Sequence, residues 1–483
     1  LILYSLTNLT VMVAQNNLSQ RLYESYSDFK ENEIINKRFS HQEMMNVLEK
    51  YKKSDLIKIN NAGYSIEGRE IKLIRIGTGP INVLAWSQMH GDESTATMAL
   101  LDMLKFFDSK NNEFSEVIDF IISNISFYFI PMLNPDGTEQ FTRRNEMDID
   151  LNRDALRLQF PESKILKSAQ DSLNPLFSFN LHDQNTRYTV GDSYKVATIS
   201  FLAPAFNFEK DINEVRENSM KLISFLKKEL DHFIPGHIAK YSDDFEPRAF
   251  GDNFVKWGSS VILIESGGWK NNYEKQFLRK INFITLIGGL NSIANNSYLE
   301  ESTDVYTEIP ENQKKLFDLL LRNVTVSKNN IDYKIDIGIN QNEKGTFDKR
   351  EFYFDGRIED IGDLSTFYGF DELDCQGMRL EPAKVSSKIF KDIYDLIKID
   401  VINIITEGYS FVMVDSISSD ENFTNLPINI LNSKSEYKID FGLNEAANFN
   451  LTQNDELILI CVNGFLFDVR SQKNNIKNGK IIK

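Results

Sequence analysis

Short apolar runs and longer periodic segments alternate between residues 71 and 264, and this alternation constrains the fold more than any other feature of the sequence. The short runs are rich in β-branched and aromatic residues, which is typical of buried strands. The predicted strands are Ile71–Ile76, Ile81–Trp86, Ile125–Leu133, Leu176–Leu181 and Val261–Ile264, and the predicted helices are Thr95–Phe107 and Ile212–Phe233. Strands that alternate with helices predict an α/β fold, a sheet with helices on its faces.

The composition of the sequence changes near residue 300, where Asn, Asp, Lys and short strand-like runs become frequent. We therefore predict three parts: an apolar leader over residues 1–22, an α/β domain over 23–300 and a β-rich accessory region over 301–483. Within the accessory region Tyr333–Asn340 resembles Tyr437–Asn444, which suggests an internal duplication. The accessory region contains no histidine, so it cannot supply an imidazole ligand to a metal site.

Charge and cysteine content exclude several classes of protein. At 483 residues the chain is long enough for more than one domain. Asp and Glu outnumber Lys and Arg by 70 to 54, a net charge of −16. Nucleic-acid binding needs clustered basic side chains, so we expect no nucleic-acid partner. The two cysteines, Cys375 and Cys461, are too few for a disulfide scaffold or a cysteine-rich zinc finger.

The first residues, Leu1–Gln15, are mostly apolar and uncharged and end in Val-Met-Val-Ala-Gln. This composition resembles the apolar core of a secretory signal, from which we expect a secreted or periplasmic protein. The basic segment of a secretory signal is missing, so the alternative is a truncated start or an ordinary apolar strand. In that case the protein could also be cytoplasmic. No window has 18 consecutive apolar residues, so we expect no transmembrane anchor.

The segment Gln88–Glu93 follows one predicted strand and precedes a predicted helix. Two residues separate His90 from Glu93, a spacing that lets an imidazole and a carboxylate converge on one cation. His182 follows the strand that ends at Leu181 and adds a second imidazole. Two histidines and one glutamate form a ligand set that zinc often has in hydrolytic sites, where water takes the fourth position. The sequence therefore predicts a zinc site at these three residues.

Glu265 is the candidate proton acceptor for a water molecule in such a site. It ends the apolar run Val261–Ile264 and precedes Ser266-Gly-Gly268, so a solvated surface position explains it poorly. A buried structural ion pair is the alternative interpretation.

All four candidate residues fall just past the predicted end of a strand, where α/β sheets bind their ligands. Each also has a structural alternative when it is considered alone. Glu93 would suit the first turn of a helix, and His182 would suit the hydrophobic core. The shared placement favours a functional site over these separate explanations.

Several residues between the two histidines are candidates for binding an anionic substrate. Arg143 and Arg144 follow the turn-like Asn134-Pro-Asp-Gly137, and Asn152 and Arg153 come soon after. A guanidinium can bind a carboxylate through two parallel hydrogen bonds or stabilise a developing oxyanion. An ion pair between Arg153 and a neighbouring aspartate is the structural alternative.

Pieces of the sequence resemble the zinc carboxypeptidases, the carboxypeptidase A-like metallopeptidases. They occur in the family's order over roughly residues 55–270 and are Ser65-Ile-Glu-Gly-Arg69, His90-Gly-Asp-Glu93, Asn134-Pro-Asp-Gly137, Asp150-Leu-Asn-Arg153, Leu181-His182 and Ile264-Glu265-Ser-Gly267. The resemblance implies a mixed, mainly eight-stranded sheet flanked by helices. It also implies one Zn²⁺ ion in the catalytic domain, bound by His90, Glu93 and His182, with Glu265 as general base and acid.

The resemblance also implies roles for residues that bind substrate. Arg144 would assist the oxyanion, with Arg143 as the alternative, since the stretch that carries them is shorter than in the digestive carboxypeptidases. Asn152 and Arg153 would bind a terminal carboxylate. Tyr241 is the nearest match to the family's mobile tyrosine.

The leading hypothesis is therefore a zinc metallocarboxypeptidase that hydrolyses a peptide bond next to a free C-terminal carboxylate. Metal-activated water would attack, and Glu265 would transfer the proton. One alternative is a zinc amidohydrolase that acts on N-acyl amino acids or cell-wall peptides. Another is a catalytically silent binding protein in which residues 301–483 do the work. The expected partner is a peptide or an N-acyl amino acid, and the oligomeric state is open.

Overall fold

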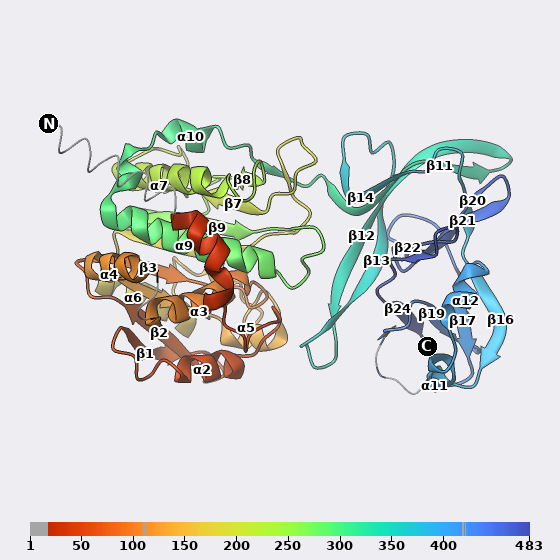
Figure 1. Cartoon of the computed structure of the whole chain (residues 1–483), viewed down its shortest axis with the longest axis horizontal. Coiled ribbons are helices and arrows are strands. Elements are labelled where there is room, and N and C mark those ends of the chain that lie inside the picture. Colours follow the sequence, from red (N-terminus) through yellow and green to blue (C-terminus); the bar gives the residue numbers. More distant parts are fainter. Residues whose placement is uncertain (1–17, 110–112, 418–419, 421) are drawn as a thin grey trace. The chain divides into compact units, whose positions relative to one another are not determined.

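The computed structural model describes residues 18–109, 113–417, 420 and 422–483 (Figure 1). The contacts between residues divide the chain into two compact units, Leu1–Lys314 and Lys315–Lys483. Of the predicted leader over residues 1–22, residues 1–17 lie outside the described residues, and residues 18–22 belong to a helix that spans residues 18–29. Among the helices of the described residues, none is long and apolar enough to cross a membrane.

The first unit is built on a mixed eight-stranded sheet, which confirms the predicted fold class. Its strands are β1 (Ile57–Tyr64), β2 (Glu70–Ile76), β3 (Ile81–Trp86), β4 (Ile125–Ile130), β5 (Phe177–Asp183), β7 (Ile199–Leu202), β8 (Ile238–Lys240) and β9 (Ser260–Ser266). They follow the order β1-β2-β4-β3-β5-β9-β7-β8. The central strands β4, β3, β5 and β9 are parallel, and antiparallel pairing begins at β2 and β7. Two short strands, β6 (Thr189–Val190) and β10 (Asn312–Gln313), pair separately.

Helices cover both faces of this sheet. They are α2 (His41–Glu49), α3 (Thr95–Asp108), α4 (Ser115–Asn124), α5 (Pro135–Gln140), α6 (Pro161–Leu173), α7 (Glu214–Leu230), α8 (Phe250–Lys256), α9 (Gln276–Asn295) and α10 (Thr303–Thr307), with the 3₁₀ turns η1 (Leu151–Arg153) and η2 (Ser297–Glu300). Successive residues of a strand point to opposite faces. In β3, Val83 and Ala85 therefore pack in the core with α3, α4, α7 and α9, whereas Leu84 and Trp86 pack in the core with α6 and α8.

The predicted strands and helices of this unit form within a few residues of their expected bounds. Two local expectations were wrong. The turn predicted at Asn134–Gly137 is the start of α5, because Pro135 suits the first helical position and the Asn134 side chain accepts a hydrogen bond from the Gly137 N–H at 2.9 Å. His182 and Glu265 lie within the last residues of β5 and β9, not beyond them.

The described residues of the second unit form two sheets, which confirms a β-rich accessory region. The nine-stranded sheet has the order β13-β12-β11-β15-β20-β21-β22-β23, with β14 paired to β11, and the five-stranded sheet has the order β16-β17-β19-β24-β18. The elements are β11 (Leu316–Lys328), β12 (Ile331–Gly345), β13 (Phe352–Gly362), β14 (Tyr368–Asp374), β15 (Arg379–Pro382), β16 (Lys384–Phe390), α11 (Ile393–Ile397), α12 (Val401–Thr406), β17 (Tyr409–Val414), β18 (Phe423–Thr424), β19 (Asn429–Asn432), β20 (Phe449–Gln453), β21 (Glu456–Val462), β22 (Phe465–Asp468), β23 (Lys473–Asn474) and β24 (Gly479–Ile482).

The two similar segments of this unit adopt different structures. Tyr333–Asn340 lies inside β12, which pairs with β11 and β13. Residues 437–444 form no strand, and Tyr437 packs instead against Phe411 with ring centroids 5.7 Å apart. A strand needs a neighbour that completes its backbone hydrogen bonds, so similar residues with different neighbours do not repeat a structure. The suggested duplication is thus not reflected in the structure of these segments.

Candidate metal and catalytic site

Three neighbouring parallel strands bring the candidate side chains to one edge of the sheet. β3 ends at Trp86, and the turn that follows carries His90 and Glu93 before α3 begins. His182 and Glu265 lie at the carboxyl ends of β5 and β9. The carboxyl ends of the strands are where open α/β sheets bind ligands.

The turn between β3 and α3 requires glycine at position 91. A Cβ atom on Gly91 would lie 2.1 Å from the carbonyl carbon of Gly137, so this turn and α5 pack backbone against backbone. The Gln88 side chain stabilises the turn, because its Nε2 donates a hydrogen bond to the Gly91 carbonyl oxygen at 3.0 Å. These contacts hold the backbone between His90 and Glu93 in place.

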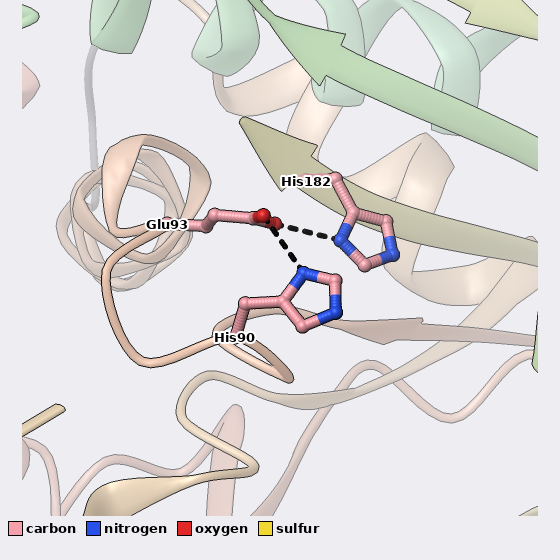
Figure 2. Close-up of side chains that lie close together, drawn as sticks. All are labelled: His90, Glu93 and His182. Carbon is pink, nitrogen blue, oxygen red and sulfur yellow. Dashed lines mark hydrogen bonds and ion pairs between the residues drawn. The ribbon is translucent and has the colours of Figure 1, made fainter. Parts of the chain in front are cut away.

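His90, Glu93 and His182 converge on one another (Figure 2). Their candidate ligand atoms all lie within 4.8 Å of one another, and all three residues are buried. Nδ1 of His90 is 2.7 Å from Oε1 of Glu93, and Nδ1 of His182 is 2.7 Å from Oε2 of the same carboxylate. Two imidazole nitrogens and one carboxylate thus surround a shared point, the donor set of a His₂Glu zinc site.

The three side chains alter one another's protonation. Burial alone would raise the pKa of Glu93, but the two imidazoles hold it well below its usual range. Burial would lower the pKa of His90, yet the charge of Glu93 and hydrogen bonds with Asp150 and Glu93 raise it to about 9. For His182 burial prevails and lowers the pKa. A buried carboxylate that stays ionised between two imidazoles suits a divalent cation, whose charge would compensate it.

Asp150 contacts this cluster, although the sequence suggested it only as an ion-pair partner for Arg153. Its Oδ1 lies 3.2 Å from Nε2 of His90, and its Oδ2 accepts hydrogen bonds from Nε and Nη2 of Arg143 at 3.1 and 2.9 Å. Metal-binding histidines usually donate their second ring nitrogen to a carboxylate or a carbonyl group. That rule is the signal that could have connected His90 with an acidic residue elsewhere in the chain.

Glu265 lies beside His182 on the same face of the sheet. The two residues are paired in the register of β5 and β9, and paired residues of neighbouring strands point to the same side. Glu265 is 8% exposed, and burial together with the charge of Glu93 raises its pKa well above the usual value. A carboxyl group with a raised pKa beside candidate metal ligands is suited to proton transfer.

Arg143, not Arg144, reaches the candidate ligands. Nη1 of Arg143 lies 3.1 Å from Nδ1 of His90 and donates to Oε1 of Glu93 at 3.3 Å. The Nη1 of Arg144 instead donates to the backbone oxygen of Asp148 at 2.7 Å. The sequence left both arginines open for the oxyanion and placed Arg144 first, whereas the structure brings Arg143 to the cluster.

Asn152 and Arg153 lie in η1, next to Asp150. Oδ1 of Asn152 accepts a hydrogen bond from the backbone N–H of Phe250 at 2.9 Å, which ties η1 to the start of α8. The Arg153 side chain is 38% exposed, and its Nε lies 3.5 Å from Oε2 of Glu246. Within the described residues, Arg153 forms no ion pair with either of its neighbouring aspartates, and its Nη1 donates to the backbone oxygen of Asn152 at 2.8 Å.

Tyr241 follows β8 and is anchored by its backbone N–H, which donates to the carbonyl oxygen of Phe201 at 2.9 Å. Its side chain is partly buried. Burial and the negative charge of Glu265 raise the pKa of Tyr241 to about 12, so the hydroxyl group stays protonated.

Residues 42–180 match the family model described as zinc carboxypeptidase, which confirms the predicted resemblance. Carboxypeptidase SOL1 from Arabidopsis thaliana is 26% identical over 145 residues, which cover 27% of this chain and 29% of that protein. Carboxypeptidase B from Astacus astacus is 33% identical over 87 residues, which cover 17% of this chain and 27% of that protein. The chain thus matches less than a third of the length of either relative.

Similar solved structures include a metallo-carboxypeptidase from Burkholderia cenocepacia, which is 16% identical with a TM-score of 0.44 over 54% of this chain and 70% of that one. The carboxypeptidase A from Helicoverpa armigera is 16% identical with a TM-score of 0.41 over 61% of this chain and 82% of that one. The family match includes His90 and Glu93 and ends shortly before His182.

Proposed function

We propose that this chain, whose residues 42–180 match the zinc carboxypeptidases, is a zinc metallocarboxypeptidase that hydrolyses the peptide bond next to a free C-terminal carboxylate. The convergence of His90, Glu93 and His182 is the single observation that carries the proposal. Three protein ligands leave one of zinc's four positions open, as hydrolytic zinc sites require.

The donor atoms present fit zinc. The Nδ1 atoms of His90 and His182 both face the Glu93 carboxylate, and Asp150 contacts the other ring nitrogen of His90. That contact fixes the ring orientation and the tautomer that a ligand histidine needs. Bound zinc would supply Lewis-acid chemistry, which activates water and polarises the scissile carbonyl group.

The other side chains have separate roles in the proposal. Glu265 takes a proton from the attacking water onto its carboxylate and passes it to the leaving amine nitrogen. Arg143 donates hydrogen bonds to the scissile carbonyl oxygen as negative charge develops there. Asn152 and Arg153 bind the terminal carboxylate, and the protonated hydroxyl of Tyr241 donates a hydrogen bond to the substrate.

The test is a metal analysis of the purified full chain together with a substrate panel. We expect one zinc ion per chain and release of the C-terminal residue from N-acyl dipeptides. Hydrolysis of N-acyl amino acids or cell-wall peptides, without hydrolysis of dipeptides, would support the zinc amidohydrolase instead. A chain that binds no zinc and hydrolyses none of these substrates would contradict both and leave a binding protein.

A further inference from the structure

A cavity of about 600 Å³ lies beside the candidate site. Its charged lining consists of Arg144, Asp150, Arg153, Asp154, Arg157 and Arg248. The charged lining has four arginines and two aspartates, so its net charge is positive. The whole chain, in contrast, carries a net charge of −16. A cleft lined mainly by one sign of charge concentrates ligands of the other sign. The cavity is therefore suited to an anionic group of the substrate.

The two aspartates of the lining are already engaged elsewhere. The Asp150 carboxylate contacts His90 and Arg143. The Asp154 carboxylate accepts two backbone N–H groups from the segment after η1, at 3.1 and 3.0 Å. Within the part of the chain that the structure describes, neither aspartate forms an ion pair with an arginine of the lining. The positive charge of the cavity is therefore not cancelled by its own lining.

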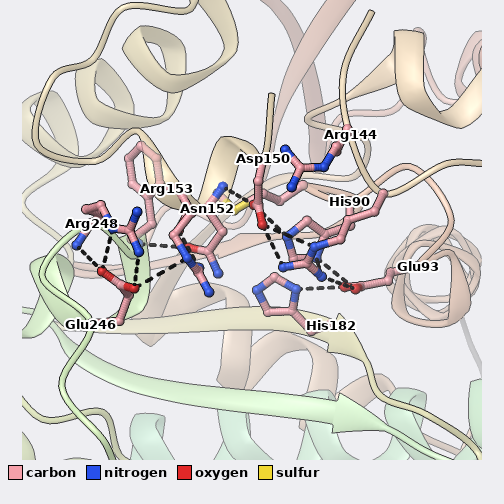
Figure 3. Close-up of polar contacts among 12 residues, drawn as sticks. His90, Glu93, Arg144, Asp150, Asn152, Arg153, His182, Glu246 and Arg248 are labelled. Atoms are coloured by element: carbon pink, nitrogen blue, oxygen red, sulfur yellow. Dashed lines mark hydrogen bonds and ion pairs between the residues drawn. The ribbon is translucent and has the colours of Figure 1, made fainter. Parts of the chain in front are cut away.

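The chain itself shows that this lining can bind a carboxylate. The Glu246 carboxylate accepts two parallel hydrogen bonds from Arg248, from Nε at 2.9 Å and from Nη2 at 2.7 Å. Nε of Arg153 lies 3.5 Å from Oε2 of the same carboxylate, so Glu246 lies between the two guanidinium groups (Figure 3). Two parallel N–H···O bonds are the strong, geometrically specific way in which arginine binds a carboxylate.

Arg157 adds a further positive charge to the lining of the cavity. The side chain is exposed, and within the described residues it forms no ion pair. Arg248 is also reachable from solvent, since its side chain is 56% exposed. The cavity thus has one arginine pair that binds an internal carboxylate and a further arginine for which the described part of the chain supplies no ion-pair partner.

We propose that the residue this enzyme removes is acidic, so that the leaving residue carries two carboxylates. Arg153, with Asn152, binds the α-carboxylate, and Arg248 and Arg157 bind the side-chain carboxylate. The substrate carboxylates replace Glu246 in its ion pairs with the arginines. This inference rests on the proposed function and specifies its substrate class.

The test compares N-acyl dipeptides that differ only in the C-terminal residue, glutamate, glutamine or lysine, with the zinc-loaded full chain. Glutamine has nearly the shape of glutamate but no charge, so the pair isolates the contribution of the carboxylate. We expect kcat/KM for the glutamate substrate to exceed that for the glutamine substrate by about 10- to 100-fold, the range that charge-assisted hydrogen bonds provide. Equal rates for these two, or a preference for lysine, would overturn the inference and leave the proposed function standing.

Variants of Arg248 and Arg157 test whether these two arginines cause the preference for glutamate over glutamine. Arg248→Gln and Arg157→Gln should each lower the ratio of glutamate to glutamine hydrolysis toward one, because each removes one side-chain contact. Lys58→Gln is the matched control, since it also removes one positive charge but lies exposed on β1 and does not line the cavity. A ratio that persists in both arginine variants would contradict the assignment.

Glu246→Gln tests whether the Glu246 carboxylate competes with the substrate carboxylates for the arginines. Loss of this charge should lower KM for the glutamate substrate, because the arginines no longer have to exchange a bound carboxylate. An unchanged or higher KM would show that Glu246 positions the arginines and does not compete for them.

A binding measurement separates this inference from the catalytic proposal. Calorimetric titration with N-acetylglutamate and N-acetylglutamine needs no turnover, and we expect the dicarboxylate to bind about 10-fold more tightly or better. If no dipeptide is hydrolysed but this preference is found, the carboxypeptidase activity is wrong and the acidic ligand class stands. Equal affinities would overturn the ligand class regardless of activity.

Discussion

His182 and Glu265 lie directly opposite each other on the neighbouring parallel strands β5 and β9. His182 is a candidate zinc ligand, and Glu265 is the candidate proton acceptor. The backbone hydrogen bonds between the two strands therefore set the distance between these two residues. Both strands are buried along their length, which leaves little freedom for either side chain to drift. A site on such elements is more precise than one on loops.

Glu265→Gln should lower kcat by about 10²- to 10⁴-fold, the usual contribution of a general acid–base group. The amide keeps the size of the side chain but cannot accept the proton. Zinc content, measured by mass spectrometry of the purified variant, should equal that of the wild type. A variant that hydrolyses dipeptides at the normal rate would contradict the proposed role.

Removal of zinc with a chelator should abolish hydrolysis and lower the melting temperature, and added zinc should restore both. A metal that binds only the folded chain stabilises it by mass action. Glu93→Ala should lose the zinc-dependent shift in melting temperature, whereas His41→Ala, which changes a histidine outside the cluster, should keep it. A shift that persists in Glu93→Ala would place the metal elsewhere.

Asp150→Asn should weaken zinc binding by about 10- to 100-fold, as loss of the partner of a ligand histidine typically does. The asparagine retains the shape but no longer supports His90 Nε2 with a negative charge. Competition with a chelating dye measures the affinity. The neighbouring Asp148→Asn serves as the control, because within the described residues the Asp148 side chain forms no hydrogen bond or ion pair, and its backbone oxygen accepts a hydrogen bond from Arg144. Equal affinities in the two variants would show that Asp150 acts through Arg143 alone.

Arg143→Gln should lower kcat/KM by about 10²- to 10³-fold, comparable to the loss of an oxyanion donor, while zinc content stays normal. Arg144→Gln should have a much smaller effect, because its guanidinium faces the backbone of Asp148. Steady-state kinetics on one dipeptide compare the two variants. The opposite ranking would restore Arg144 to the role that the sequence first suggested.

Asp252→Asn should stabilise the chain at alkaline pH. Burial raises the pKa of Asp252 to about 7, although its carboxylate accepts the backbone N–H of Glu246 at 3.0 Å. The folded state therefore holds a proton that the unfolded state releases near pH 4, and stability falls as the pH rises from about 4 to about 7. Asparagine removes this loss and can still accept the hydrogen bond through its Oδ1.

The expected gain for Asp252→Asn is at most about 4 kcal/mol at pH 8 and close to zero near pH 4, because the pKa rises from about 4 to about 7 and each unit corresponds to about 1.4 kcal/mol. Chemical unfolding at both pH values measures it, with the exposed Asp119→Asn as the control. A gain that does not depend on pH would mean that the carboxyl group of Asp252 does not titrate as its burial requires.

Local spacing along the chain was enough to predict much of the first unit. The alternation of apolar runs located the strands and the main helices, because period 2 and period 3.6 patterns each bury one side of an element. His90 and Glu93 were predictable as a pair from their spacing, because two intervening residues in a turn allow few relative positions of the two side chains. The placement of His182 and Glu265 at strand ends followed from the parallel sheet.

Contacts between distant segments were decided only by the tertiary structure. Arg143 and Arg144 are adjacent, yet one faces the ligands and the other a backbone oxygen, because one step along the chain redirects a side chain. Asp150 reaches His90, and Arg248 joins Arg153 around Glu246, only after the packing of η1 and α8 brings them together. Spacing in the sequence restricts what lies within a turn or a strand, whereas the choice of partner across the fold depends on packing.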